Sequence, residues 1–249
     1  MRKFLLFNLC LILTMFSIIA NADTNPTNLL DYYDKVWQNR DDLILVEKAV
    51  EDLDLYVATN DDVEILWRLS RFYYWLGEKT KLKKDEKIIF FQKGKLYAEQ
   101  AVNLAPGSVD SHFWLASLTG KIGETQGILQ SLFMVKPLRD GLEKVISLDK
   151  NYAPAYHGLA ILYRLVPKWP ICIGNPNTSL EYAQQAVLLA PENLEFWLGL
   201  AETYLALNDK EKALDILEGV IKAKISPQYR VESEEAKINA QKLLEGQLL

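Results

Sequence analysis

Large and small apolar residues alternate at helical spacing through most of the chain, most completely between Leu194 and Pro227. Two predicted helices in this segment carry them, at Trp197, Leu200, Ala201, Tyr204, Ala213 and Leu217. This is the order of large and small positions in a tetratricopeptide repeat, which is about 34 residues long. Small residues let two antiparallel helices approach closely, and larger ones fill the space between them. The segment therefore predicts one helix–turn–helix repeat.

The same pattern recurs upstream, in units that begin near Val63, Val109, Ala153 and Leu194, at spacings of 46, 44 and 41 residues. Each of the first three units is thus longer than a standard repeat. Counting back from the closing positions puts each excess between the two helices of a repeat, so all three insertions should emerge on one edge. We predict an all-α tetratricopeptide-repeat solenoid of four repeats over residues 63–227. Residues 23–62 and 228–249 are predicted to form capping helices.

The three insertions differ in character. The first, in the stretch EKTKLKKDEKIIFF, should lengthen a helix, and the second, GETQGILQSLFMV, should add helix bent near Pro137. The third is a loop from Pro167 to Gly174 that holds Lys168 and Trp169. We expect Trp169 to dock under the repeats and order the loop, because a large aromatic side chain is normally buried. The alternative is that Trp169 is an exposed anchor for a partner.

The N-terminus has the features of a secretory signal peptide. Arg2 and Lys3 precede an apolar run, Phe4 to Ile19, and a small-residue cleavage pattern ends at Ala22. We predict that residues 1–22 are removed, that the mature protein starts at Asp23, and that it is periplasmic without an integral membrane segment. An uncleaved anchor is the alternative, although the run is short for a span of ~30 Å. Cys10 lies inside the apolar run, so a lipoprotein is not expected.

The net charge limits the classes of possible partner, and the cysteine content limits how the fold can be stabilised. The net charge is −5 and becomes −7 when Arg2 and Lys3 are removed, which disfavours nucleic acid and anionic lipid heads as partners. The mature chain keeps one cysteine, Cys172, so no intramolecular disulfide can form and the fold must rest on packing.

Residues typical of enzymes are sparse. The two histidines, His112 and His157, lie 45 residues apart in successive first helices, without the cluster that a metal site needs. Cys172 has no paired cysteine or histidine, and no phosphate-binding, dinucleotide or nucleophile-elbow motif occurs. We predict no enzymatic activity, no cofactor and no metal.

The first helices of the repeats should line a groove. From the repeat register, its candidate ligand or partner residues are Trp67, Arg71, Tyr74, Trp75, Phe113, Lys121, His157 and Arg164. The heads of Arg71, Lys121 and Arg164 could share one volume and favour an anionic ligand with an apolar body. Two alternatives stay open: the aromatic residues pack as core against residues 88–91, and each cation pairs with a nearby acid.

The stretch GLAILYRLVPKWPICIGNPNTSLEYAQQAVLLAPENLEFWLGLAETYLALND carries a family resemblance. A helix ending in Pro-x-Trp-Pro, a Gly-bearing loop and a helix ending Leu-Ala-Pro resemble the TRAP transporter T-component family of periplasmic tetratricopeptide proteins. The arrangement is also similar to the regulator of microtubule dynamics family, whose first repeat resembles WRLSRFYYWLGE and YAEQAVNLAP. The resemblance implies an all-helical, non-catalytic protein that associates with a periplasmic substrate-binding protein and often with itself. The lipobox cysteine of many such proteins is missing.

Two functions follow as hypotheses. The first is an auxiliary component of a TRAP-type solute uptake system that associates with a substrate-binding protein and binds an apolar or organic-acid ligand in its groove. The second is an envelope scaffold that holds other proteins and takes no small molecule.

Overall fold

The computed structural model describes residues 26–246, so the predicted signal peptide lies outside the described residues. The chain divides into two compact units, Met1–Lys35 and Val36–Leu249. The described part of the first unit is helix, the beginning of α2 (Pro26–Gln38). No helix among the described residues is both long and apolar enough to cross a membrane.

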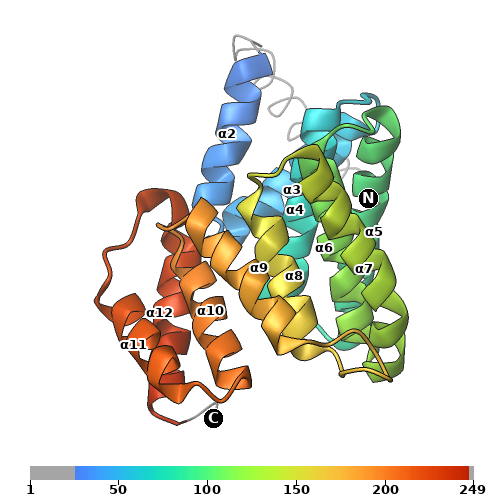
Figure 1. The fold of residues 1–249 in the computed structure, drawn as a ribbon. Helices are drawn as coiled ribbons and strands as arrows, with labels where there is room; N and C mark the ends of the chain where they lie inside the picture. The colour runs from blue at the N-terminus through green and yellow to red at the C-terminus, as the bar shows by residue number, and fades with distance from the viewer. Residues whose placement is uncertain (1–25, 247–249) are drawn as a thin grey trace. The chain divides into compact units, whose positions relative to one another are not determined.

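The second unit is built from α-helices, with no strand among its described residues (Figure 1). After the end of α2 they are α3 (Leu43–Val57), α4 (Val63–Lys79), α5 (Lys84–Leu104), α6 (Val109–Gln126), α7 (Ile128–Leu148), α8 (Ala153–Leu165), α9 (Pro176–Leu189), α10 (Leu194–Ala206), α11 (Lys210–Lys222) and α12 (Arg230–Leu244). A short 3-10 turn, Pro227–Tyr229, precedes α12.

The helices form four antiparallel pairs, α4–α5, α6–α7, α8–α9 and α10–α11. Their first helices begin at Val63, Val109, Ala153 and Leu194, the positions at which the sequence pattern places the starts of the repeats. Close approach depends on small residues. At Gly94 of α5, an added Cβ would lie 2.8 Å from the Cβ of Tyr73 on α4. The predicted all-α tetratricopeptide-repeat solenoid is confirmed.

Short polar side chains start several of these helices. Asp62 accepts hydrogen bonds from the backbone N–H groups of Glu64 and Ile65 at the start of α4. Asn175 does the same for Asn177 and Thr178 at the start of α9. Such caps satisfy backbone donors that have no partner inside the helix, and they fix where each helix leaves its turn.

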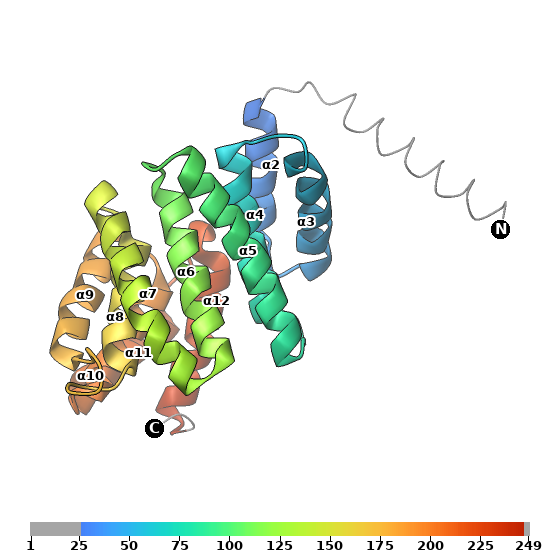
Figure 2. The ribbon, with the colours of Figure 1, turned by 90° about the vertical axis from the view of Figure 1, so that its right-hand side faces the viewer.

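The first two insertions are absorbed as helix. The second helices that carry them, α5 and α7, each have 21 residues, whereas α9 has 14 and α11 has 13. Pro137 lies inside α7, which continues through it. Lys84 at the start of α5 donates to the carbonyl of Gln126 at the end of α6, at 3.1 Å, so these two insertions are neighbours. Figure 2 shows the α6–α7 turn and the α8–α9 loop at the lower end of the view.

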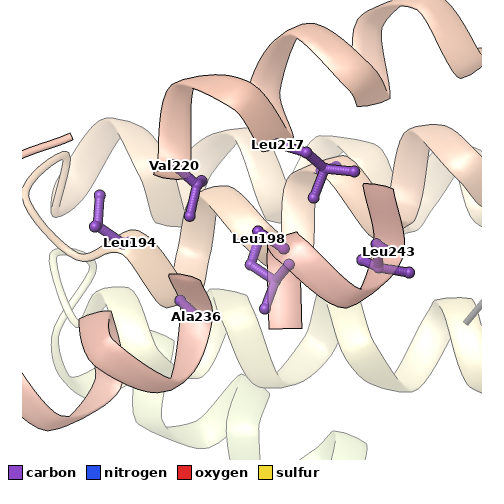
Figure 3. Packing of buried hydrophobic residues seen from close by; sticks show 8 residues of the cluster. Leu194, Leu198, Leu217, Val220, Ala236 and Leu243 are labelled. Carbon is purple, nitrogen blue, oxygen red and sulfur yellow. The ribbon is translucent and has the colours of Figure 1, made fainter. Parts of the chain in front are cut away.

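The last helix covers the apolar side of the last repeat. Leu194 and Leu198 of α10, Leu217 and Val220 of α11, and three residues of α12 form one buried cluster (Figure 3); the three are Ala236, Ala240 and Leu243. Burial of this surface removes apolar area from water and stabilises the end of the stack.

Candidate functional site

The candidate site is the side of the first helices on which the predicted groove residues lie, hereafter the first-helix face. It is formed by α4, α6, α8 and α10. Its predicted members are Trp67, Arg71, Tyr74 and Trp75 on α4, Phe113 and Lys121 on α6, and His157 and Arg164 on α8. The structure divides them into an aromatic part and a polar part.

The aromatic part is centred on Trp37, which lies before the first repeat and which no repeat position predicts. The ring of Trp37 makes edge contacts with Phe72, Trp75 and Trp114, with ring centroids 6.0, 6.0 and 5.5 Å apart. Trp67 and Trp75 are only 7% exposed. Edge-to-face aromatic pairs at these distances are favourable in themselves. The aromatic side chains of α4 are therefore largely core residues, and Trp37 packs among them.

Two arginines complete this packing. The Arg40 guanidinium lies 4.4 Å from the Trp37 ring and 4.7 Å from the Trp75 ring. Its backbone carbonyl accepts a hydrogen bond from the Trp75 indole at 2.5 Å. Arg71 lies 4.9 Å from the rings of both Trp37 and Trp67. Such cation–π contacts gain strength when the cation is removed from water, and both arginines are buried.

Tyr74 and Phe113 also pack against other rings. Tyr74 lies 6.4 Å from Phe91 of the first insertion and 5.5 Å from Trp114. Burial raises the pKa of the Tyr74 phenol to about 12. Phe113 lies 5.2 Å from both Trp114 and Tyr152. For Tyr74, this is the packing against residues 88–91 that the sequence left as an alternative.

The polar part begins at Lys121. Its ammonium lies 2.9 Å from Glu78 of α4 and 3.0 Å from Glu124 of its own helix. Arg164 lies 2.6 Å from Glu202 and donates to the carbonyl of Gly199 at 3.0 Å. The three predicted cations are thus engaged at separate places: Arg71 lies against rings and its charge also acts on Asp110, and the other two pair with carboxylates. The alternative in which cations pair with nearby acids holds for Lys121 and Arg164.

His157 and Glu195 occupy the face between α8 and α10. The His157 ring packs 4.7 Å from Phe196, and its Nε2 is 3.9 Å from a Glu195 oxygen. Burial, followed by the nearby Arg164 charge, lowers the pKa of His157 to about 3, so the ring is neutral near pH 7. Burial, followed by Glu232 and Glu235, raises the pKa of Glu195 from 4.5 to about 7. Although the helices crowd this carboxyl, 46% of its side chain is accessible.

We expect Glu195→Gln to make the protein more stable above pH 7 and to leave it unchanged at pH 4. A carboxyl whose pKa is raised in the folded state contributes stability that is full below pH 4.5 and is lost as pH rises through about 7. Because water screens a partly accessible group, we expect the Tm at pH 8 to rise by only about 1–3 °C. Thermal melts at both pH values test this, with the exposed Glu181→Gln as control; equal shifts in the two variants would contradict it.

The accessible polar side chains of the face are mostly acidic. Glu78 and Glu202 are 31% and 33% exposed, Glu195 is 46% exposed and Glu124 is 70% exposed. Lys121 and Arg164, at 21% and 11%, are less accessible than their carboxylate partners. We name these four glutamates the acidic strip. A molecule that approaches the first-helix face therefore meets carboxylates first.

Ion pairs join α12 to the segment before α3 and to the end of α4. Arg40 lies 2.6 Å from Glu232, and Lys79 lies 2.6 Å from Glu235. Arg230 pairs with Asp41 and donates to the carbonyl of Gln38 at 3.3 Å. We call these contacts the clasp. The C-terminal cap therefore contacts the beginning of the second unit as well as the last repeat.

The third insertion corrects the sequence expectation. Trp169 is 85% exposed, so the prediction that it docks under the repeats is wrong. The backbone and the loop's other side chains hold the loop instead. Asn175 N donates to the carbonyl of Tyr163 at 2.8 Å, and Gly174 N donates to that of Pro167 at 2.9 Å. Cys172 and Ile173 pack on the core cluster between α7 and α8. Lys168 is exposed beside Trp169.

Trp169→Ala is accordingly expected to change the free energy of unfolding by less than about 0.5 kcal/mol, because substitutions of exposed side chains rarely do more. Urea or thermal unfolding measures it. A loss of several kcal/mol, as for a buried aromatic residue, would show that Trp169 orders the loop after all.

The remaining polar residues do not suggest chemistry. The His112 ring lies 3.0 Å from the carbonyl of Pro106. Within the described part of the chain, no group of three His, Cys, Asp or Glu residues is placed to hold a metal ion. Binding by the predicted site residues stays a prediction.

Comparison with protein families gives two matches. The family model described as "Regulator of microtubule dynamics protein 1-3" matches residues 30–166. A tetratricopeptide-repeat model matches residues 174–230.

Individual relatives are consistent with these two family matches. Regulator of microtubule dynamics protein 1 of Mus musculus is 28% identical over 245 residues, which cover 92% of this chain and 77% of the relative. The protein of the same name from Pongo abelii is 26% identical, over 91% of this chain and 74% of its own length. The structure of a thermophilic TPR protein from Thermus thermophilus superposes with a TM-score of 0.60 at 18% identity, over 87% of this chain and all of that one. This last similarity concerns the fold alone.

Proposed function

We infer the function from one premise: the chain belongs to the regulator of microtubule dynamics protein 1-3 family, whose model matches more than half of it. Its repeats are of the tetratricopeptide type, whose stacked helices present long surfaces to other polypeptides. We propose that the protein is a non-catalytic scaffold that mediates protein–protein interactions through its first-helix face.

The class of ligand is inferred from the acidic strip. Because Lys121 and Arg164 are each paired with a carboxylate, neither is available to clamp an organic acid without breaking an ion pair. The more exposed groups are carboxylates, which accept hydrogen bonds from basic side chains and backbone N–H groups. This favours a polypeptide with basic residues over the anionic small molecule that the sequence suggested.

Charge reversal on the strip tests this proposal. We expect Glu124→Lys to reduce capture of the partner by about tenfold, the effect of a changed charge contact in an interface. Glu218→Lys on α11 is the matched control, since both glutamates are more than half exposed and both pair with a lysine on their own helix. Affinity purification from the native host, quantified by mass spectrometry, is the measurement. Equal capture by both variants would contradict a role of the strip.

We further propose that the scaffold acts outside the cytoplasm and serves a TRAP-type uptake system by holding its substrate-binding protein. The support is the leader-like sequence of residues 1–22 and the resemblance carried by the Pro167–Gly174 loop. N-terminal analysis of protein from the native host should find Asp23. A mature protein that starts at Met1 would argue against removal of the leader.

A second candidate function comes from the relatives, whose names describe regulators of microtubule dynamics. Under this alternative the scaffold's partner is a microtubule or a protein bound to one. Co-sedimentation with polymerised tubulin separates the two candidates: pelleting with polymer but not with free tubulin would favour this alternative, and a lack of pelleting would leave the envelope partner.

A further inference from the structure

The second and third insertions leave several large apolar side chains exposed. Five of the most exposed large apolar side chains of the described residues belong to the second and third insertions, and a sixth, Leu165, ends α8 directly before the third. Trp169 is 85% exposed, and the other five are between 68% and 83% exposed: Ile128, Leu129, Phe133, Leu165 and Ile171. Exposed apolar groups that gather in one region mark an interaction surface.

These residues lie on one edge of the second unit. The α6–α7 turn and the α8–α9 loop are at the same end of the helices in both views (Figures 1 and 2). The loop's inner residues, Cys172 and Ile173, pack in the same cluster as Val135 of α7. The Lys84–Gln126 hydrogen bond joins the first insertion to the second. We call residues 79–87, 124–136 and 165–175 the insertion edge.

The charge of this edge is opposite to that of the chain. Its three segments hold seven lysines and three acidic residues, a net charge of +4, whereas the whole chain carries −5. Lys81, Lys83, Lys84, Lys136 and Lys168 are exposed. The next turn along the stack, residues 207–212, is balanced, with two lysines and two acids. The net charge of the chain, which disfavours anionic lipid, therefore does not describe this edge.

We propose that the insertion edge docks on the surface of an anionic phospholipid bilayer. Tryptophan and aliphatic side chains at the tips of turns suit the boundary between headgroups and acyl chains, and flanking lysines suit anionic headgroups. A bilayer is favoured over a protein because the apolar groups lie on separate tips among exposed lysines. Docking in this way would leave the rest of the first-helix face directed to a partner.

The loop is built to present its tip. Cys172 and Ile173 face the core while Trp169 and Ile171 are exposed, and the Asn175–Tyr163 and Gly174–Pro167 hydrogen bonds fix the two ends. An anchor that is already ordered loses little conformational freedom on insertion.

Quenching of tryptophan by brominated lipids tests the proposal. The full chain is mixed with vesicles of equal parts phosphatidylglycerol and phosphatidylcholine brominated on their acyl chains. Because residues 4–19 are apolar, vesicle binding alone is no test, so the readout is the quenching that Trp169 contributes. We expect strong quenching in the parent protein and its loss in Trp169→Phe. Trp197→Phe is the matched control, because this half-buried indole donates to Pro191 in the α9–α10 turn, away from the insertion edge.

The headgroup requirement is tested in the same assay. We expect a triple change, Lys81→Gln, Lys83→Gln and Lys84→Gln, to raise the lipid concentration for half-maximal quenching by more than about tenfold, since each lysine near an anionic surface contributes roughly fivefold. Pure phosphatidylcholine vesicles should quench Trp169 weakly. Thermal melts check that the variants remain folded.

Three results would overturn the proposal. Quenching that is the same in Trp169→Phe and the parent would place the edge outside the bilayer. Equal quenching of Trp169 on neutral and anionic vesicles would show that the lysines do not bind anionic headgroups. A dimer that Trp169→Ser/Ile171→Ser dissociates, without any lipid quenching, would assign the edge to a second copy of the chain.

Discussion

Arg40→Ala is expected to lower the free energy of unfolding by about 2–4 kcal/mol, since removing one partner of a buried ion pair leaves the other charge uncompensated. The Arg40 side chain is 4% exposed and its partner Glu232 is 22% exposed. The second Glu232 carboxylate oxygen is buried and accepts no hydrogen bond within the described structure. The change also removes the cation from the Trp37 and Trp75 rings. Urea unfolding gives the value.

Arg230→Ala provides the control within the clasp. Arg230 is 32% exposed and its partner Asp41 is 53% exposed, so this loss should stay below about 1 kcal/mol. Glu232→Gln combined with Arg40→Ala should recover part of the loss, because the isolated buried charge is then gone. If Arg40→Ala cost no more than Arg230→Ala, the clasp would not hold α12 to the beginning of the second unit.

Gly174→Ala is expected to lower the free energy of unfolding by about 2–4 kcal/mol, the second large effect. A Cβ at this position would lie 2.0 Å from the Val166 carbonyl oxygen and 2.7 Å from that of Pro167. Both atoms belong to the backbone, so a change of side-chain rotamer cannot relieve the clash. The loop would therefore have to shift away from the core cluster on which Cys172 and Ile173 pack. Unfolding free energy and amide exchange of residues 163–175 measure the effect.

Gly219→Ala is the matched control for that glycine. It lies inside α11, and nothing is within 4 Å of its added Cβ. Alanine there should stabilise the protein by about 0.5–1 kcal/mol through helix propensity. Equal responses of the two variants would contradict a specific clash at Gly174.

The repeats could be predicted from the sequence because their signal is local. Small residues such as Ala98, Ala101, Ala183 and Ala186 are buried where helices meet, and they recur at a spacing that the chain displays directly. The positions of the insertions follow from the same spacing. Helical periodicity therefore located the starts of all four first helices and the edge on which the insertions emerge.

The site could be predicted only in part, because contacts between distant segments decide it. Trp37 fills the aromatic part and Arg40 meets Glu232, 192 positions later in the chain. No local pattern signals such a pairing. The repeat pattern predicts which helices form the first-helix face, but which residues of that face are accessible depends on Trp37 and on the clasp.

Trp169 shows why residue type alone is a weak guide to burial. Tryptophan is usually buried, yet here the smaller Cys172 and Ile173 take the core positions and the largest side chain of the loop is left outside. Which side chains of a short irregular loop face the core and which face solvent depends on the path of its backbone. Here the prolines and Gly174 determine that path, together with contacts to α8.

Site-specific photo-crosslinking in the native host tests most directly whether the first-helix face holds a polypeptide. Benzoylphenylalanine replaces Ser117, one helical turn before Lys121 on α6, or the exposed Lys144 on α7 as control. We expect the probe at position 117 to give one dominant protein adduct that Glu124→Lys weakens, and the probe at position 144 to give none. An adduct at position 144 with none at position 117 would contradict the assignment of the first-helix face as the binding surface.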